Sequence, residues 1–385
     1  MPAPLGLKNL MHNGRRTLVA TAGVTFAVAL MFLQLGFLQT AETTATTVYK
    51  PLKFDVCLIS KDYHFAADAR SVPRFRLYEA ASVPGVQEAQ PLNVGINQWR
   101  NPHNGEASPV MVLGVDPTSE IFASLASAEE FALLTAPHYI LIDSQTRPEL
   151  GPAAGDRFGP ADAGREIELG IRTVRIRGTF VLGAGFAAAG AVLTSDSGFG
   201  YLFPGHSDDS MSVGLLRLEP DANAPRVARE INALLDDEDV LVLTKEQILE
   251  RESDRWVEQT SYGIIFRLGC FIAFLVGTGI VYQILSSDVA NHRAEYATLR
   301  AIGYRNSYIN LVVLQQAIAL AVLGTIPGIG VAFLLYTLTA RQARIPISLT
   351  TTNVLVVVGL TLAMCLVSGL IALRKVRQAD PADLF

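Results

Sequence analysis

The chain has 385 residues, of which 50% are hydrophobic and only 17% are charged. This charged fraction lies well below the roughly 25% of ordinary soluble domains, so the composition argues against a soluble protein and indicates a membrane protein. Residues 41–258 contain 32 acidic and 19 basic residues, whereas the rest of the chain contains 4 acidic and 12 basic residues. Such segregation is expected when the two parts lie on opposite sides of a membrane.

The chain begins with residues 1–16, which carry Lys8, Arg15 and Arg16. We predict a cytoplasmic amphipathic segment here, able to lie on the membrane surface. Residues 17–39 are predominantly apolar, carry no charged residue and are long enough for a first transmembrane helix, which needs about 20 residues. A cleaved signal peptide is the alternative, but its apolar core would span only roughly 7–15 residues. We therefore expect an uncleaved anchor.

Residues 40–260 have the pattern of a folded α+β domain. Alternating or buried apolar runs predict strands at 53–60, 110–115 and 138–143. Helical patterns follow Pro73 and Ala224, and a last helix at 245–259 is expected to run directly into the second span. Within the domain, we expect residues 53–115 and 211–260 to form porter-like strand–helix–strand units, and residues 116–210 to form an inserted subdomain.

Three more apolar segments predict transmembrane helices at 261–285, 309–339 and 353–373. Residues 286–308 and the tail 374–385 join the N-terminus in carrying most of the Lys and Arg near span ends, so all three are expected in the cytoplasm. The loop 340–352, with Arg341 and Arg344, is then periplasmic. The predicted fold class is a membrane protein with four transmembrane α-helices and a large α+β periplasmic domain between helices 1 and 2.

The motifs of common enzymes are absent from the sequence. There is no GxxxxGK[ST] phosphate-binding loop and no zinc spacing of Cys and His. The GxG in residues 182–190 lacks a βαβ context, and "SDSGFG" at 195–200 is not a nucleophile elbow. The sequence has no basic patch of the kind that binds nucleic acids. We therefore predict a non-catalytic subunit with no catalytic residue, metal ligand or cofactor of its own.

Small residues recur at four-residue spacing in three of the predicted spans, a pattern that lets helices approach closely. Packing within the chain, packing in a dimer and ordinary membrane Gly and Ala content all remain open as explanations. The residues are Gly23, Ala27, Gly269, Ala273, Gly277, Gly324 and Gly328. A further candidate is the charged Arg267 within span two. It is interpreted either as snorkelling to the headgroups or as a functional intramembrane charge.

The segment between spans two and three has the pattern of a short helix rather than of a plain loop. Ala294, Ala297, Ala301 and Tyr304 fall near one helical face, and Gly303 can end the helix. The charged residues of this helix can make charge-assisted contacts with a partner. The candidate coupling residues are Arg293, Glu295, Tyr296, Leu299, Arg300, Ala301, Gly303 and Tyr304.

Four stretches resemble the FtsX/MacB-type permeases of ABC systems, and in particular their DevC-type branch. The first resembles the N-terminal helix and first span of that family. The stretches are residues 6–37, Arg74–Pro102, Val281–Tyr304 and Ala372–Phe385. The resemblance covers essentially the whole chain and is weaker from about Thr118 to Asp209.

The resemblance implies a bacterial inner-membrane permease dimer that works by mechanotransmission. A separate DevA-like cytoplasmic ATPase would bind ATP and Mg²⁺ and push on the coupling helix. A DevB-like periplasmic adaptor and a TolC-type outer-membrane channel would complete a tripartite pump for a glycolipid-type or other amphipathic substrate, and membrane lipids would surround the permease. Two alternatives remain: an FtsX-like signalling or scaffold protein that controls a cell-wall hydrolase, and, more weakly, a membrane-bound enzyme.

Overall fold

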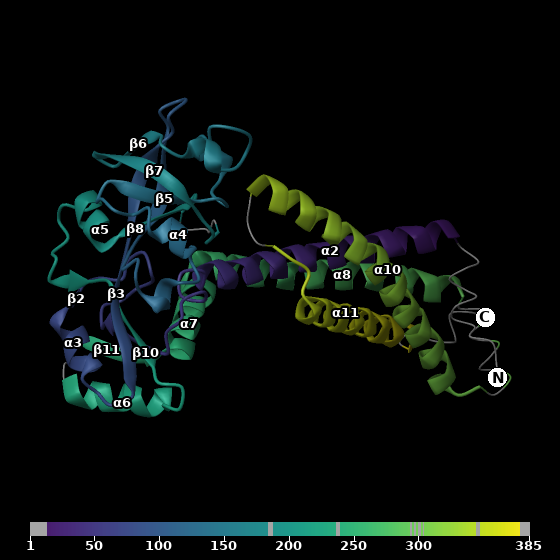
Figure 1. The fold of residues 1–385 in the computed structure, drawn as a ribbon. Helices are drawn as coiled ribbons and strands as arrows, with labels where there is room; N and C mark the ends of the chain where they lie inside the picture. The colour runs from purple at the N-terminus through teal and green to yellow at the C-terminus, as the bar shows by residue number, and fades with distance from the viewer. Residues whose placement is uncertain are drawn as a thin grey trace. The chain divides into compact units, whose positions relative to one another are not determined.

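The computed structural model describes residues 14–183, 188–235, 239–292, 295, 298, 302, 304–343 and 347–377. The chain divides into two compact units (Figure 1). The helix unit comprises residues 1–39, 261–340 and 347–385, and the α+β domain comprises residues 40–260 and 341–346.

Among its described residues, the helix unit contains four helices that are long and apolar enough to cross a membrane. The predicted number of spans is therefore confirmed. The helices are α2 (Gly14–Ala45), α8 (Ser261–Asn291), α10 (Asn306–Ala343) and α11 (Thr351–Arg377). The first of them ends inside the α+β domain, since Gln39 is its last residue assigned to the helix unit.

The four helices pack around one apolar core in which α2 contributes Val24, Met31 and Phe32. Several polar groups inside this core are paired. The hydroxyl of Tyr336 donates to the backbone carbonyl of Phe32, and Thr25 Oγ1 donates to the carbonyl of Gly324 at 3.2 Å. Such pairing is expected because an unsatisfied polar group is costly in hydrocarbon.

The α+β domain is built on a nine-stranded mixed sheet in the order β11-β1-β10-β3-β4-β8-β5-β7-β6. A separate two-stranded sheet joins β2 to β9. The strands are β1 (Val56–Ser60), β2 (Val72–Pro73), β3 (Val86–Arg100), β4 (Ala107–Val115), β5 (Tyr139–Asp143), β6 (Glu166–Leu169), β7 (Arg172–Phe180), β8 (Ala191–Ser195), β9 (Ser210–Met211), β10 (Val213–Leu218) and β11 (Val240–Thr244).

Short helices connect and cover these strands. The α-helices are α3 (Phe75–Ala81), α4 (Ala128–Phe131), α5 (Asp196–Leu202), α6 (Ala224–Leu235) and α7 (Lys245–Asp254). The 3-10 helices are η1 (Glu120–Phe122), η2 (Pro148–Leu150) and η3 (Pro160–Asp162), and η4 (Arg255–Gln259) is a π-helix. One apolar cluster unites α3 and α6 with β1, β10 and β11.

The long strand β3 joins the two parts of the sheet. Its first half, from Val86 to Leu92, pairs antiparallel with β10, and its second half, from Asn93 to Arg100, pairs antiparallel with β4. Residues 116–210 add β5 to β8 to this same sheet. The predicted division into porter-like units and an inserted subdomain stays a prediction.

The predicted continuous helix from Lys245 into span two is wrong. The α-helical part α7 ends at Asp254, and η4 carries the chain to Gln259. Thr260 then has extended backbone angles, φ −94° and ψ 154°, which interrupt the helix before α8 begins at Ser261. A π-helical turn is uncommon and frequently occurs at functional sites.

Candidate functional site

Most of the predicted coupling residues lie outside the residues that the structure describes. This applies to Arg293, Tyr296, Leu299, Arg300, Ala301 and Gly303. Of the two that are described, Glu295 is helical and exposed, and Tyr304 is 46% exposed. The ring of Tyr304 lies 4.9 Å from the ring of Tyr308 in α10. The role of all eight residues stays a prediction.

The two helices that flank the coupling segment are joined by a polar contact that the sequence did not predict. Gln316 Nε2 in α10 donates a 2.8 Å hydrogen bond to Asp288 Oδ2 in α8. Gln316 is fully buried and Asp288 is 8% exposed. His292 Nδ1 lies 3.7 Å from Asp288 Oδ1. Because hydrogen bonds between membrane helices contribute to their association, this pair joins α8, in which the coupling segment begins, to α10, in which it ends.

The sequence itself indicates that the carboxyl group of Asp288 has a specific partner. Asp288 is one of only four acidic residues outside positions 41–258. An acid next to a long apolar run is expensive and indicates a specific partner. The identity of that partner could not be predicted, since Gln316 is one of two adjacent glutamines in an apolar helix.

The small residues of the predicted packing stripes lie against other helices of the same chain. A Cβ added to Gly324 or Gly328 in α10 would lie 2.4 or 2.5 Å from a side-chain carbon of Val24 or Val28 in α2. A Cβ on Gly277 would lie 2.3 Å from Met364 Sδ in α11. Ala27 and Ala273 are buried, at 1% and 2% exposure.

The remaining two glycines are similarly placed. A Cβ on Gly23 would meet Ile280, and one on Gly269 would meet Gln34, both at 2.5 Å. Arg267 has an exposed side chain on α8. Its two interpretations, snorkelling and functional charge, remain open.

The α+β domain contains a buried carboxyl group on α7, which is the last helix before η4. A capping box between Thr244 and Gln247 starts α7 and places Ile248 and Glu252, four residues apart, on its buried face. Glu252 is only 1% exposed. The hydroxyl of Tyr63 donates to Glu252 Oε1, and the backbone N–H of Ala66 lies 3.4 Å from Oε2.

A second buried phenol, that of Tyr49, continues the hydrogen bonds that begin at Glu252 and Tyr63. The hydroxyl oxygens of Tyr49 and Tyr63 are 2.7 Å apart, and both side chains are at most 2% exposed. Burial raises the pKa of Glu252 to about 7, although the hydrogen bonds from Tyr63 and Ala66 act in the opposite direction. Burial also raises the pKa of Tyr63, so that its phenol stays protonated and can donate. The carboxyl group therefore changes charge near neutral pH.

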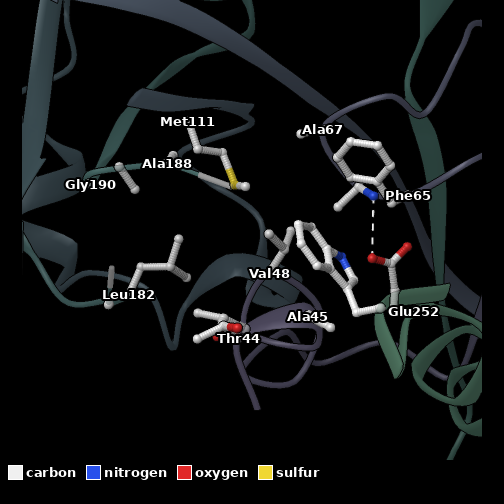
Figure 2. Close-up of a pocket in the computed structure, with 15 residues that line it drawn as sticks. Thr44, Ala45, Val48, Phe65, Ala67, Met111, Leu182, Ala188, Gly190 and Glu252 are labelled. Atoms are coloured by element: carbon white, nitrogen blue, oxygen red, sulfur yellow. Dashed lines mark hydrogen bonds between the residues drawn. The ribbon is translucent and has the colours of Figure 1, made fainter. Parts of the chain in front are cut away.

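A small pocket lies beside this carboxyl group (Figure 2). Figure 2 shows Met111 and Leu182 on one side and Phe65 and Glu252 on the other, with Val48 between them. The indole of Trp256 in η4 packs edge-to-face on Phe65, with ring centroids 5.9 Å apart. The cavity volume of about 40 Å³ is enough for one or two water molecules, so it does not hold a large substrate in this conformation.

No triad or metal site accompanies these groups in the described part of the chain. Among those residues, no cluster of three or more His, Cys, Asp or Glu side chains could hold a metal ion. The thiol of Cys57 is fully buried, and burial raises its pKa. The described residues thus form four candidate membrane spans and a large α+β domain.

Comparison with protein families identifies the class more closely. Residues 17–234 match the MacB-like periplasmic core domain, and residues 267–381 match the FtsX-like permease C-terminal region. The first match covers more than half of the chain. The chain therefore belongs to the MacB/FtsX-like permeases, the membrane subunits of ABC transporters that work with a cytoplasmic ATPase, and its α+β domain is periplasmic.

Solved structures give weaker likenesses. The periplasmic region of MacB from Actinobacillus actinomycetemcomitans matches at 9% identity and a TM-score of 0.38, covering 52% of this chain and 94% of that structure. The extracellular domain of the transporter YknZ from Gram-positive bacteria matches at 13% identity and a TM-score of 0.34, covering 49% and 98%. A domain of a Porphyromonas gingivalis permease matches at 13% identity and a TM-score of 0.33, covering 49% and 88%. A comparison with curated proteins gives no significant match.

Proposed function

We propose that this chain is the permease subunit of a tripartite exporter and converts ATP-driven motion of a separate ATPase into movement of its periplasmic domain. The observation that carries the proposal is the presence of a MacB-like periplasmic core and an FtsX-like C-terminal region in one chain. In this proposal, the N- and C-termini and the segment at 286–308 lie in the cytoplasm of a bacterial cell, at the inner membrane. Two copies of the permease assemble with the ATPase.

The coupling segment is the proposed docking point for the ATPase. The segment begins in α8 and ends in α10, and the hydrogen bond between Gln316 and Asp288 joins these two helices, so a push on the segment displaces them together. These helices share an apolar core with α2 and α11. A packed core of this kind transmits displacement because protein interiors are close-packed and deform little.

The proposed cargo is amphipathic or lipid-like, of the glycolipid type, and is taken from the periplasm or outer leaflet. The DevC-like stretches at Arg74–Pro102 and Val281–Tyr304 support this class of exporter over FtsX-like signalling. A periplasmic adaptor of the membrane-fusion type and a TolC-type channel complete the proposed path. No ATP or Mg²⁺ binds to this chain in the proposed mechanism, because both belong to the ATPase.

Deletion of the gene for this chain in its native host distinguishes the export proposal from the signalling alternative. Export predicts that the mutant retains amphipathic lipids that wild-type cells release, and that an affinity-tagged permease co-purifies with an ATPase and an adaptor. A mutant with unchanged release but altered cell-wall hydrolysis would overturn the export proposal in favour of the signalling alternative.

A further inference from the structure

A groove of about 410 Å³ lies between α10 and α11 at one end of the helix unit. Its apolar part is formed by Leu311 and Leu314 of α10 and by Leu370 and Leu373 of α11. Leu311 and Leu370 are 50% and 55% exposed, so a large part of this apolar surface is open. None of its lining residues lines the Glu252 pocket or is one of the eight predicted coupling residues, and one of them, Ser307, lies in the coupling segment at 286–308.

The polar part of the groove is formed by Ser307, Asn310 and Arg374. In α10, the polar Ser307 and Asn310 come before the leucines, near the start of the helix. In α11, the polar Arg374 comes after the leucines, near the end of the helix. The start of α10 and the end of α11 both line this groove, so its polar groups gather at one face of the membrane and its leucines extend toward the hydrocarbon.

The charge of this end of the groove is positive. Arg374 is exposed, and the sequence continues with Lys375 and Arg377. No acidic residue occurs between Arg305 and Leu320 or between Leu366 and Arg377. A ligand with an anionic head would therefore meet attraction without repulsion from these two helix segments.

We propose that this groove binds one anionic phospholipid. The phosphate of the headgroup lies against Arg374, with hydrogen bonds from Ser307 and Asn310, and an acyl chain lies along the four leucines. A soluble anion would contact only the polar residues of the groove and leave the leucines uncovered. A phospholipid contacts both, because its headgroup reaches the polar residues while its acyl chain covers the leucines. Basic pockets between membrane helices commonly bind anionic headgroups in this way. The proposal does not depend on the identity of the ATPase or the cargo.

The test uses the full-length chain purified in a mild detergent and mixed with equal amounts of phosphatidylglycerol and phosphatidylcholine with identical acyl chains. Native mass spectrometry counts the lipid of each kind that stays bound. Wild-type protein is expected to retain phosphatidylglycerol preferentially, and Arg374→Gln to reduce that preference about fivefold, the ratio expected for one basic residue near an anionic lipid. Arg374→Lys, which keeps the charge, should retain most of the preference.

Three further variants distinguish lipid binding in the groove from lipid binding elsewhere on the helices. Leu370→Gln in α11 should weaken retention of both lipids. Leu334→Gln, which changes a similarly exposed leucine of α10 outside the groove, should not. Arg341→Gln, in the last turn of α10, should keep the wild-type preference. Equal retention of the two lipids by the wild type, or an unchanged preference in Arg374→Gln, would overturn the proposal. Displacement of phosphatidylglycerol by equimolar free glycerol phosphate would also overturn it, because the site would then bind a soluble anion.

Discussion

Gln316 in α10 donates a 2.8 Å hydrogen bond to Asp288 in α8, 28 residues earlier in the chain. Asp288 lies inside the coupling segment at 286–308, near its start, and Gln316 lies eight residues beyond its end. The pair therefore joins the two helices that would move when an ATPase pushes on that segment.

The first prediction concerns this hydrogen bond. Asp288→Ala and Gln316→Ala should each destabilise the helix unit, and the double variant should cost less than the sum of the two. The expected interaction energy is about 0.6 to 1.7 kcal/mol, as in other membrane proteins. Reversible unfolding of the purified chain in mixed micelles gives this energy through a double-mutant cycle. An interaction energy of zero would show that the contact does not hold the helices.

The second prediction concerns the pH dependence of the periplasmic domain. The pKa of Glu252 is raised to about 7 from its ordinary 4.5, so the folded state binds a proton more tightly than the unfolded state. The stability contributed by this proton is fully present below pH 4.5 and is lost as the pH rises to 7. The loss should be on the order of 3 kcal/mol.

Tryptophan fluorescence measures this effect in the intact chain, because both tryptophans, Trp99 and Trp256, belong to the domain. Glu252→Gln should remove most of the decrease in stability between pH 5 and pH 8. The control Glu250→Gln changes an exposed carboxyl group on the same helix and should leave the decrease intact. Equal pH profiles for the wild type and Glu252→Gln would contradict the prediction.

The third prediction uses glycines as steric probes. Gly277→Ala and Gly328→Ala would place a methyl group within 2.3 and 2.5 Å of neighbouring side chains, so each should destabilise the helix unit by about 1–3 kcal/mol. Gly279 and Gly330 have nothing within 4 Å of an added Cβ. Their alanine variants should be neutral or slightly stabilising, since alanine favours helix by up to about 1 kcal/mol. Thermal unfolding in detergent compares the pairs, and equal effects within a pair would refute the packing argument.

The fourth prediction concerns topology. A cysteine at the exposed Ser207 should react with a membrane-impermeant maleimide added to cells from the periplasmic side, and one at the exposed Ser307 should react only after the inner membrane is opened. Of the three native thiols, Cys57 and Cys365 are fully buried and Cys270 is partly exposed. Cys270 is therefore replaced by serine in the parent chain used for labelling. The opposite labelling pattern would reverse the proposed orientation of the termini.

The sequence predicted the four spans and the α+β class because apolar length and alternation are strong signals. It did not predict β3, since Pro91 and Gly95 interrupt the pattern of this 15-residue strand. The break at Thr260 was also missed, because residues 245–259 have helical composition and a π-turn has no clear sequence signature. These features depend on tertiary pairing, which a single sequence does not show.

The candidate sites were predicted less completely than the fold. Glu252 looks like one more surface acid in a charged helix, and only the packing of Tyr49 and Tyr63 around it explains its burial. The small residues were identified from their spacing, but their partners, such as Val24 for Gly324, depend on how the helices cross. The coupling residues were identified mainly through family resemblance, and six of the eight lie outside the described residues.

The central claim is that the segment at 286–308 receives the motion of a separate ATPase. Its most direct test is the ATPase activity of the partner enzyme, reconstituted in nanodiscs with the full-length permease. Glu295→Ala combined with Arg300→Ala should reduce permease-dependent stimulation about tenfold or more, as expected for the loss of charge-assisted contacts. The control pair Arg229→Ala and Glu230→Ala, exposed on α6, should keep it. Full stimulation by the coupling variant, with membrane insertion unchanged, would contradict the account.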